Sequence, residues 1–292
     1  MTLVFPGCVL ADSGMAADLE ASPLFSSTAL PAGVTQYLDD YQRSSFWSSV
    51  STVSPDYHLL LDPSDIPAVT LHVPASQGLT VFDPFTNRIQ GVVGGAWLYR
   101  QLLSLMNSLH VSPTTLPIFV PYNTYVTDQN PNDCLTPQSC GFYLGFHAAV
   151  PSNQKPHAIN TFAFASYLDL GTELPPSFDI GTEVASHEIL EWAADPFVHN
   201  IRIKGQVTTL INTAPAWSSP FYGAGSLCAN FLEVADPLEG GPLLFASPVG
   251  SSTNYLLADA AFLPWFARES PSSAIFGIYD LGGIFSTYSA SC

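Results

Sequence analysis

The sequence predicts an α+β fold in which one central helix lies between two lobes. The chain has 292 residues and is 47% hydrophobic, which is enough apolar material for a sizeable core. Segments with helical spacing of apolar residues alternate with short apolar runs typical of strands, and no linker separates them. We therefore expect an N-terminal α+β lobe over residues 1–178, and the central helix with a C-terminal lobe of the same unit over residues 179–292.

The N-terminal lobe is expected to contain two helices and several strands. Apolar residues recur at helical spacing over residues 33–50 and again over residues 95–109. Short apolar runs predict strands at residues 58–62, 69–73, 116–120, 142–150 and 158–166. A loop rich in Pro, Asn and Asp covers residues 121–141, and its length indicates a functional or disulfide-pinned excursion.

The C-terminal lobe follows the central helix, which we expect to begin near residue 180 and to end before Pro196. Beyond this proline, Lys204-Gly205 predicts the turn of a hairpin. Residues 255–267 have the apolar spacing of another helix, and residues 277–289 are expected to form a final strand pair.

The charge of the chain argues against nucleic-acid and membrane partners. Seven Lys and Arg residues stand against 24 Asp and Glu residues, so the net charge is −17. Binding to phosphate backbones or anionic lipids requires a cationic face, which so few basic residues do not supply. No run approaches the roughly 18 apolar residues of a membrane-spanning helix. The sequence leaves the oligomeric state open.

The five cysteines indicate an oxidising compartment. Cys134 and Cys140 enclose a short polar loop whose spacing suits a disulfide better than free thiols. Cys228 and Cys292 would form a second pair and leave Cys8 over. The N-terminus lacks the basic start and apolar stretch of a signal peptide, so either a leader has been removed or the chain is not exported. The cysteines favour an extracellular or periplasmic location.

The central helix carries an H-E-x-x-E motif formed by His187, Glu188 and Glu191. At about 100° per residue, His187 and Glu191 lie about 40° apart on one face, the spacing at which zincin helices present two metal ligands. The rest of the helix is apolar, which predicts a buried position for these groups and for Glu183 and Asp195. Burying an unpaired carboxylate costs several kcal/mol, and a bound dication removes most of that penalty. The alternative is a solvated helix face with i,i+4 polar pairs.

Further metal ligands are expected downstream of this helix. A zinc site needs at least a third protein ligand and an open position for water. Glu233 and Asp236 are the densest later acids and are the best candidates, and His199 is another. We expect one divalent metal, with zinc first, while the oxygen-rich donor set leaves calcium and manganese open.

Glu188 is the candidate catalytic residue because it points about 100° away from His187. In zincins, the Glu at this position is the general base that takes a proton from metal-activated water and passes it to the leaving amine. The motif therefore predicts a metal-dependent endopeptidase that acts on peptides or proteins. Two alternatives stay open: a secreted binding or cell-surface protein with a structural metal, and a hydrolase of non-peptide amides or esters.

The motif also resembles a known family. The segment S-H-E-I-L-E-W-A-A-D-P from Ser186 to Pro196, followed by E-V-A-D from Glu233 to Asp236, is similar to the H-E-x-x-E-A-x-T-D-P and E-I-x-D patterns of the phosphate-induced (exordium-like) proteins and their bacterial secreted relatives. Two further stretches, C-G-F-Y from Cys140 and F-L-P-W-F-A-R from Phe262, resemble parts of that family.

The resemblance covers roughly residues 85–292. It implies a zincin-like fold, export, and a metal at His187, Glu191 and the Glu233–Asp236 segment. The chain departs from the family pattern at Trp192, where a small residue is expected, and at Pro237, where a polar residue or Cys is expected.

Overall fold

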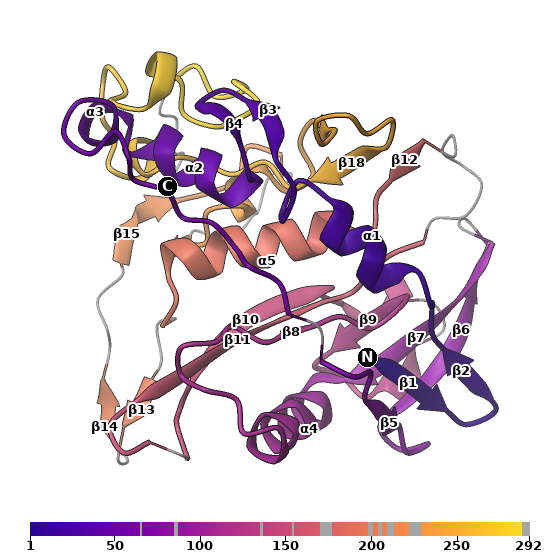
Figure 1. Ribbon diagram of the computed structural model, residues 1–292. Coiled ribbons are helices and arrows are strands. Elements are labelled where there is room, and N and C mark those ends of the chain that lie inside the picture. Colours follow the sequence, from indigo (N-terminus) through magenta and orange to yellow (C-terminus); the bar gives the residue numbers. More distant parts are fainter. Residues whose placement is uncertain are drawn as a thin grey trace.

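The central helix, α5 (Glu183–Ala194), lies where the sequence predicts it, with a layer of strands on one side and helices, short strands and loops on the other (Figure 1). The structure is a computed structural model. It describes residues 1–64, 66–84, 87–134, 137–153, 155–169, 177–197, 201–203, 206–208, 213–221 and 229–287. Helices and strands mix along the chain, so the α+β class is confirmed.

The layer against one side of α5 is a three-stranded sheet in the order β10 (Gly145–Pro151), β11 (Ile159–Ala165) and β8 (Ile118–Phe119). The first pair is antiparallel and the second is parallel. Phe162 and Phe164 of β11 belong to a core that includes the long helix α4 (Gly95–Ser108). Ala165 joins the core of α5 instead, because side chains alternate between the faces of a strand. The sheet is thus buried between α4 and α5.

Two further sheets extend this part of the molecule (Figure 1). One consists of β6 (Gly78–Asp83), β7 (Arg88–Gly94) and β9 (Thr124–Thr127), and its strand β7 continues directly into α4. The other consists of β2 (Cys8–Leu10), β1 (Thr2–Phe5) and β5 (Thr70–His72). The predicted helix at residues 95–109 and the predicted strand at residues 69–73 are therefore confirmed.

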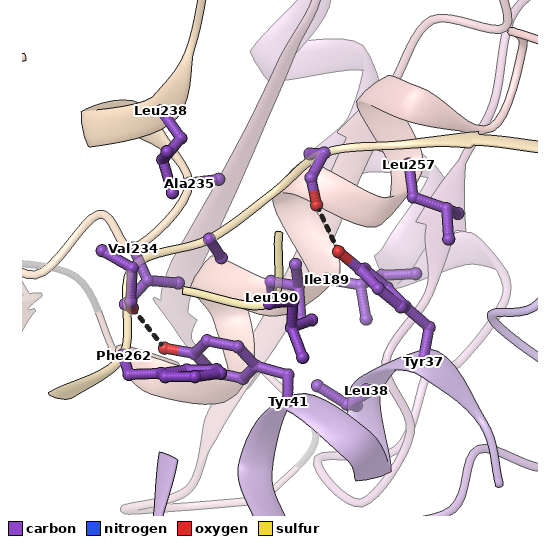
Figure 2. Packing of buried hydrophobic residues seen from close by; sticks show 14 of the residues in the cluster. Tyr37, Leu38, Tyr41, Ile189, Leu190, Val234, Ala235, Leu238, Leu257 and Phe262 are labelled. Atoms are coloured by element: carbon purple, nitrogen blue, oxygen red, sulfur yellow. Dashed lines mark hydrogen bonds between the residues drawn. The ribbon is translucent and has the colours of Figure 1, made fainter. Parts of the chain in front are cut away.

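The opposite side of α5 is covered by segments from both ends of the chain (Figure 2). Tyr37 and Tyr41 of helix α2 (Tyr37–Ser45) donate hydrogen bonds to the backbone carbonyls of Ala258 and Ala261, at 2.6 and 3.0 Å. Their rings share a core with Ile189 and other residues of α5. Residues before and after position 178 thus build one hydrophobic core around the helix. The lobe boundary predicted there stays a prediction.

The remaining elements are short. On the α2 side they are α1 (Met15–Ala21), α3 (Trp47–Val50), β3 (Thr28–Leu30), β4 (Gly33–Thr35), β12 (Phe178–Asp179), β17 (Leu244–Ala246), β18 (Asn254–Leu257) and α6 (Leu263–Phe266). Two antiparallel pairs follow α5, namely β13 (Ile201–Ile203) with β14 (Gln206–Thr208) and β15 (Thr213–Trp217) with β16 (Ala229–Phe231). The predicted hairpin is confirmed, and its turn residues lie outside the described residues. The 3-10 turns within the described residues are η1 (Pro131–Asp133), η2 (Pro137–Cys140), η4 (Asp236–Leu238) and η5 (Ile275–Gly277).

Some of the predicted elements are wrong. Residues 58–62 form no strand, because side chains at the start of α2 bind their backbone amides: Leu59 N–H donates to Asp39 and Leu61 N–H to Gln36, the residue before the helix, both at 2.6 Å. The helix predicted over residues 255–267 is the strand β18 followed by the short helix α6. Its apolar residues are buried because β18 pairs with both β12 and β17, so their spacing does not reflect a helical face.

The strand pair predicted at the C-terminus is also not found within the described part of residues 277–289. That segment makes a single bridge, between Ala261 and Asp280. Its backbone amides bind the carboxylates of Asp259 and Asp280 instead of a partner strand.

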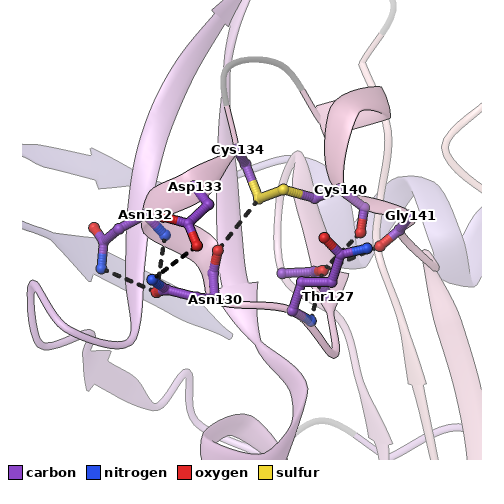
Figure 3. The surroundings of a disulfide bond; sticks show 8 residues. Thr127, Asn130, Asn132, Asp133, Cys134, Cys140 and Gly141 are labelled. Atoms are coloured by element: carbon purple, nitrogen blue, oxygen red, sulfur yellow. Dashed lines mark hydrogen bonds between the residues drawn. A yellow bond between two sulfur atoms is a disulfide. The ribbon is translucent and has the colours of Figure 1, made fainter.

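The predicted disulfide between Cys134 and Cys140 is present (Figure 3). It closes the turn region after β9, and Thr127 of that strand donates hydrogen bonds from its hydroxyl to the carbonyls of Cys140 and Gly141 at 3.1 and 3.0 Å. Cys8 is a free cysteine, and the predicted pair of Cys228 and Cys292 lies outside the described residues. Within the described ranges, no helix has the length and apolarity needed to cross a membrane.

Candidate metal centre

The apolar residues of α5 bury the helix that carries the H-E-x-x-E motif. Val184, Ile189 and Leu190 pack into the core, so the polar side chains on the intervening positions are carried inside with them. The helix ends at Asp195, whose backbone N–H still donates to the Glu191 carbonyl at 2.7 Å before Pro196 stops it. As predicted, Glu188 and Glu191 are buried, at 5% and 4% exposure.

The segment Glu233–Asp236 is held against α5 by its two middle residues. Val234 and Ala235 are buried among Leu190 and its neighbours (Figure 2). The backbone N–H of Ala235 donates to Oε1 of Glu191 at 3.3 Å. The E-V-A-D pattern thus anchors apolar residues in the core and leaves an acid at each end beside the helix.

One group of potential ligands matches the sequence prediction. Nε2 of His187 lies 3.1 Å from Oε1 of Glu191 and 3.4 Å from Oδ1 of Asp236. One ligand atom from each of these residues lies within 4.8 Å of the others. The i,i+4 spacing on α5 brings the imidazole and the first carboxylate together, and η4 supplies the second. These three residues could hold a metal ion.

A second group contains His147, which the sequence analysis missed. Its Nδ1 atom lies 3.9 Å from Oε2 of Glu191 and 3.8 Å from Oε2 of Glu233. These three residues also offer ligand atoms within 4.8 Å of one another. Glu233 therefore lies with His147 and not with His187, so the four predicted ligands are divided between two groups that share Glu191.

His147 projects from β10, on the sheet layer below α5, and its side chain is 2% exposed. Nε2 lies 3.1 Å from the backbone carbonyl of Asp195. Because a carbonyl only accepts, Nε2 carries the proton, and Nδ1 faces the carboxylates. The signal in the sequence was a lone histidine within an apolar strand segment. That signal was too weak to predict a site, because a strand pattern does not show which helix will cover it.

Glu188 lies between the two layers, against β10. Its Oε2 atom is 3.7 Å from Nδ1 of His147, beyond normal hydrogen-bond length, and has no hydrogen-bond partner among the described residues. A Cβ atom at Gly145 would come within 2.3 Å of Oε1 of Glu188. Only glycine at this position allows the Glu188 carboxylate to lie where it does.

The pKa values of these buried groups are shifted by burial and by the charges of their neighbours. Burial lowers the pKa of His147, but the carboxylates of Glu188, Glu233 and Glu191 outweigh it and raise that pKa to about 9. Burial, followed by the charge of Glu191, raises the pKa of Glu233 to about 9. Burial also raises the pKa values of Glu188 and Glu191. Without a cation the cluster must retain protons, and a divalent metal would replace them.

The cluster lines a cavity of about 580 Å³ between α5 and the start of β10. His147, His187, Glu188 and Glu191 contribute to its wall, together with Phe142 to Phe146 and the downstream acids. Glu183 also lines it, and burial raises the pKa of that carboxyl. The potential ligands therefore face a space large enough to admit part of a substrate.

The donor set of each group favours a transition metal. Each combines one imidazole with two carboxylates, a set that suits zinc or manganese, whereas calcium prefers oxygen ligands alone. His199, the other candidate ligand, lies outside the described residues. Trp192, where the family pattern has a small residue, donates its indole N–H to the hydroxyl of Thr161 on β11 at 2.9 Å and so helps to fix α5 on the sheet.

Comparison of the chain with protein-family models, curated proteins and solved structures gives no match. The resemblance to the phosphate-induced (exordium-like) family therefore rests on the sequence motifs alone, and the function is inferred from the site itself.

Proposed function

We propose that the chain is a secreted, zincin-like metallopeptidase that hydrolyses peptide bonds at the metal centre on α5. One observation carries the proposal: two histidines and the acids Glu188, Glu191, Glu233 and Asp236 all line one cavity of about 580 Å³. Buried ionisable groups that share a cavity with few neutralising partners are typical of catalytic sites.

The residues divide into ligands and a proton carrier. His187, Glu191 and Asp236 would hold a zinc ion, as the distances between their ligand atoms allow. A zinc ion at this position would lower the pKa of a bound water to about 7. Glu188 would take the proton of the attacking water and pass it to the leaving amine. Its Oε2 atom has no hydrogen-bond partner within the described ranges, which leaves this carboxylate available for that role.

The strand at the cavity supports a peptide as substrate. Ser166 N–H donates to the Leu144 carbonyl on the β11 side, while Tyr143 exchanges both backbone hydrogen bonds with Val126 of β9 on the other side. Backbone groups alternate along a strand, so those of Gly145 point to the same side as those of Tyr143, away from β11. Gly145 and Glu188 both line the cavity, so an extended peptide bound along this strand would lie beside Glu188.

Secretion is supported by the disulfide and by the composition. The Cys134–Cys140 bond requires an oxidising compartment. The scarcity of basic residues fits a protein that works outside the cell. Export is part of the proposal and is tested by locating the protein in cell fractions of its source.

The function is tested with untagged protein and a mixture of quenched fluorescent peptides. We expect hydrolysis that stops when a chelator removes the metal and returns when zinc is added. Glu188→Gln is expected to lower kcat by about 10²- to 10⁴-fold while the zinc content, measured by plasma mass spectrometry, stays unchanged.

A matched control is Glu20→Gln, which removes the same charge from helix α1, outside the cavity, and should leave kcat unchanged. Full activity in Glu188→Gln would refute its role as the base. A tightly bound metal with no hydrolysis of any peptide would refute the peptidase and leave a binding protein with a structural metal.

A further inference from the structure

The two ligand groups meet at Glu191, and each group faces a different oxygen of its carboxylate. Oε1 is the atom 3.1 Å from Nε2 of His187, whereas Oε2 is the atom 3.9 Å from Nδ1 of His147. The two imidazoles therefore approach one carboxylate from its two oxygens. A carboxylate approached in this way can bridge two cations.

A single ion does not account for all of these groups. Among the described residues, the two histidines fall into separate ligand groups, and only Glu191 belongs to both. A catalytic zinc ion is tetrahedral, with three protein ligands at about 2.0–2.2 Å and a water in the fourth position. One ion bound by His187, Glu191 and Asp236 would leave His147 and Glu233 without a role.

On the His147 side, three carboxylate oxygens lie at similar distances from one imidazole nitrogen. The Oε2 atoms of Glu188, Glu191 and Glu233 lie 3.7, 3.9 and 3.8 Å from Nδ1 of His147. These separations are too long for hydrogen bonds and only slightly longer than the roughly 3.3–3.5 Å between ligands of a tetrahedral zinc ion. The Oε2 atoms of Glu188 and Glu233 are buried without a hydrogen-bond partner in the part of the chain that the structure describes. An unpartnered carboxylate oxygen on a residue 95% buried is otherwise strongly unfavourable.

The balance of charge also favours two ions over one. Glu188, Glu191, Glu233 and Asp236 carry four negative charges when ionised, and neutral imidazoles carry none. One divalent ion neutralises half of that charge, and two neutralise all of it. Since a buried uncompensated charge is costly, the acids match a pair of divalent ions.

We propose that the centre binds two divalent transition-metal ions bridged by Glu191, the first held by His187 and Asp236 and the second by His147 and Glu233. The hydrogen bond from Nε2 of His147 to the Asp195 carbonyl fixes the ring so that Nδ1 faces the second ion. Glu188 lies beside this second position, where its Oε2 atom stays available as a base. The inference deepens the proposed function, since it concerns the same site, and it assigns to His147 a role that the motif on α5 does not indicate.

The stoichiometry is tested by equilibrium dialysis of the metal-free chain against Zn²⁺ alone, followed by plasma mass spectrometry. We expect two Zn²⁺ ions per chain for the unchanged protein and one for His147→Ala. His72→Ala removes an exposed histidine from β5 and is the control, expected to keep both ions. One ion per chain in the unchanged protein, or an unchanged count in a folded His147→Ala, would overturn the proposal.

A second measurement needs no variant. Loaded with Mn²⁺, the chain should give the electron paramagnetic resonance spectrum of an exchange-coupled pair, because a bridging carboxylate holds two ions about 3.5–4 Å apart. A spectrum of isolated Mn²⁺ ions would overturn the shared ligand. Two coupled ions without peptide hydrolysis would refute the peptidase and leave this inference intact. Hydrolysis by a protein with one ion would do the reverse.

Discussion

Two buried regions of the molecule handle carboxylates in opposite ways. In the C-terminal loops, Asp259 accepts from the backbone amides of Ala260, Leu281 and Gly282, and Asp280 accepts from those of Ile284 and Phe285. Around α5, the Oε2 atoms of Glu188 and Glu233 have no hydrogen-bond partner among the described residues.

The difference separates acids that organise the fold from acids that belong to the proposed metal centre. Backbone amides satisfy Asp259 and Asp280 completely, so these two residues replace a strand pair as the organisers of a loop. The acids at α5 face one another and two imidazoles across a cavity, an arrangement that stores unfavourable free energy until a cation binds. Burial alone would not distinguish the two regions, because both are buried.

The largest expected change in the free energy of unfolding comes from metal binding to the acids and imidazoles at α5. Saturating Zn²⁺ should raise the free energy of unfolding of the metal-free chain by about 4 kcal/mol when its concentration is a thousandfold above the dissociation constant. Chemical denaturation with and without the metal measures the increase. Glu191→Ala removes the residue shared by both ligand groups and should abolish it. Equal stabilisation of this variant by zinc would show that the metal binds elsewhere.

The next largest change in the free energy of unfolding is expected for Asp280, one of the two acids of the C-terminal loops. Asp280→Ala leaves two backbone amides without an acceptor, each worth about 1–3 kcal/mol, and relieves the repulsion that, after burial, helps to raise the pKa of Asp259 to about 7. We expect a net loss of about 3 kcal/mol in the free energy of unfolding, measured by denaturant titration. The zinc stoichiometry should not change. A loss of metal in this variant would show that the loop acids also support the ligand groups at α5.

Asp40 of α2 combines features of both regions, because one of its carboxylate oxygens accepts a backbone hydrogen bond and the other has no partner in the described structure. Its Oδ1 atom accepts from Ala32 N–H at 2.6 Å, and its Oδ2 atom is buried without a partner in the described structure. Burial raises its pKa to about 7, an effect increased by Asp39 and opposed by Arg43. An unfolded aspartate loses its proton near pH 4, so between about pH 4 and 7 the folded state binds more protons and stability falls as the pH rises.

Asp40→Asn should remove this fall. Relative to the unchanged protein, the variant is expected to gain about 2 kcal/mol between pH 4.5 and 7.5, measured by denaturation at a series of pH values. The other acids titrate in both proteins, so only the difference between the two curves reports on Asp40. Parallel curves would mean that this carboxyl is ionised in the folded protein at acidic pH.

The smallest effect sharpens the contrast with Asp280. Glu188→Gln leaves no backbone amide without an acceptor, and it removes an ionisable group from a buried site. The metal-free variant should therefore be as stable as the unchanged protein at neutral pH, or more stable by about 1 kcal/mol. Calorimetry in the presence of chelator measures the difference. A loss as large as that of Asp280→Ala would place Glu188 among the acids that organise the fold.

The sequence predicted all three residues of one ligand group and two of the three residues of the other. His187 and Glu191 were selected by their i,i+4 spacing, and Glu233 and Asp236 were selected because they are the densest acids after the helix. His147 reaches the cluster only because β10 lies across α5, which is a property of the tertiary fold. No local pattern contains that information.

The same reasoning explains the errors in secondary structure. The apolar run of β18 was interpreted as a helix because burial on both faces of a strand resembles helical spacing. The segment at residues 58–62 was interpreted as a strand because it is a short apolar run, although side chains at the start of α2 bind its amides. In both cases the partner is distant in the sequence, so the outcome depended on contacts that a local pattern does not show.

The hydrogen bonds of Tyr37 and Tyr41 have a consequence for how the protein is made. Their acceptors, the carbonyls of Ala258 and Ala261, are synthesised more than two hundred residues later. Chains dominated by such distant contacts fold slowly, because a long loop must close before the contacts form. The cover over α5 is therefore completed only after residue 261 has left the ribosome. Until then the candidate ligands on α5 lack the enclosure that the finished fold gives them.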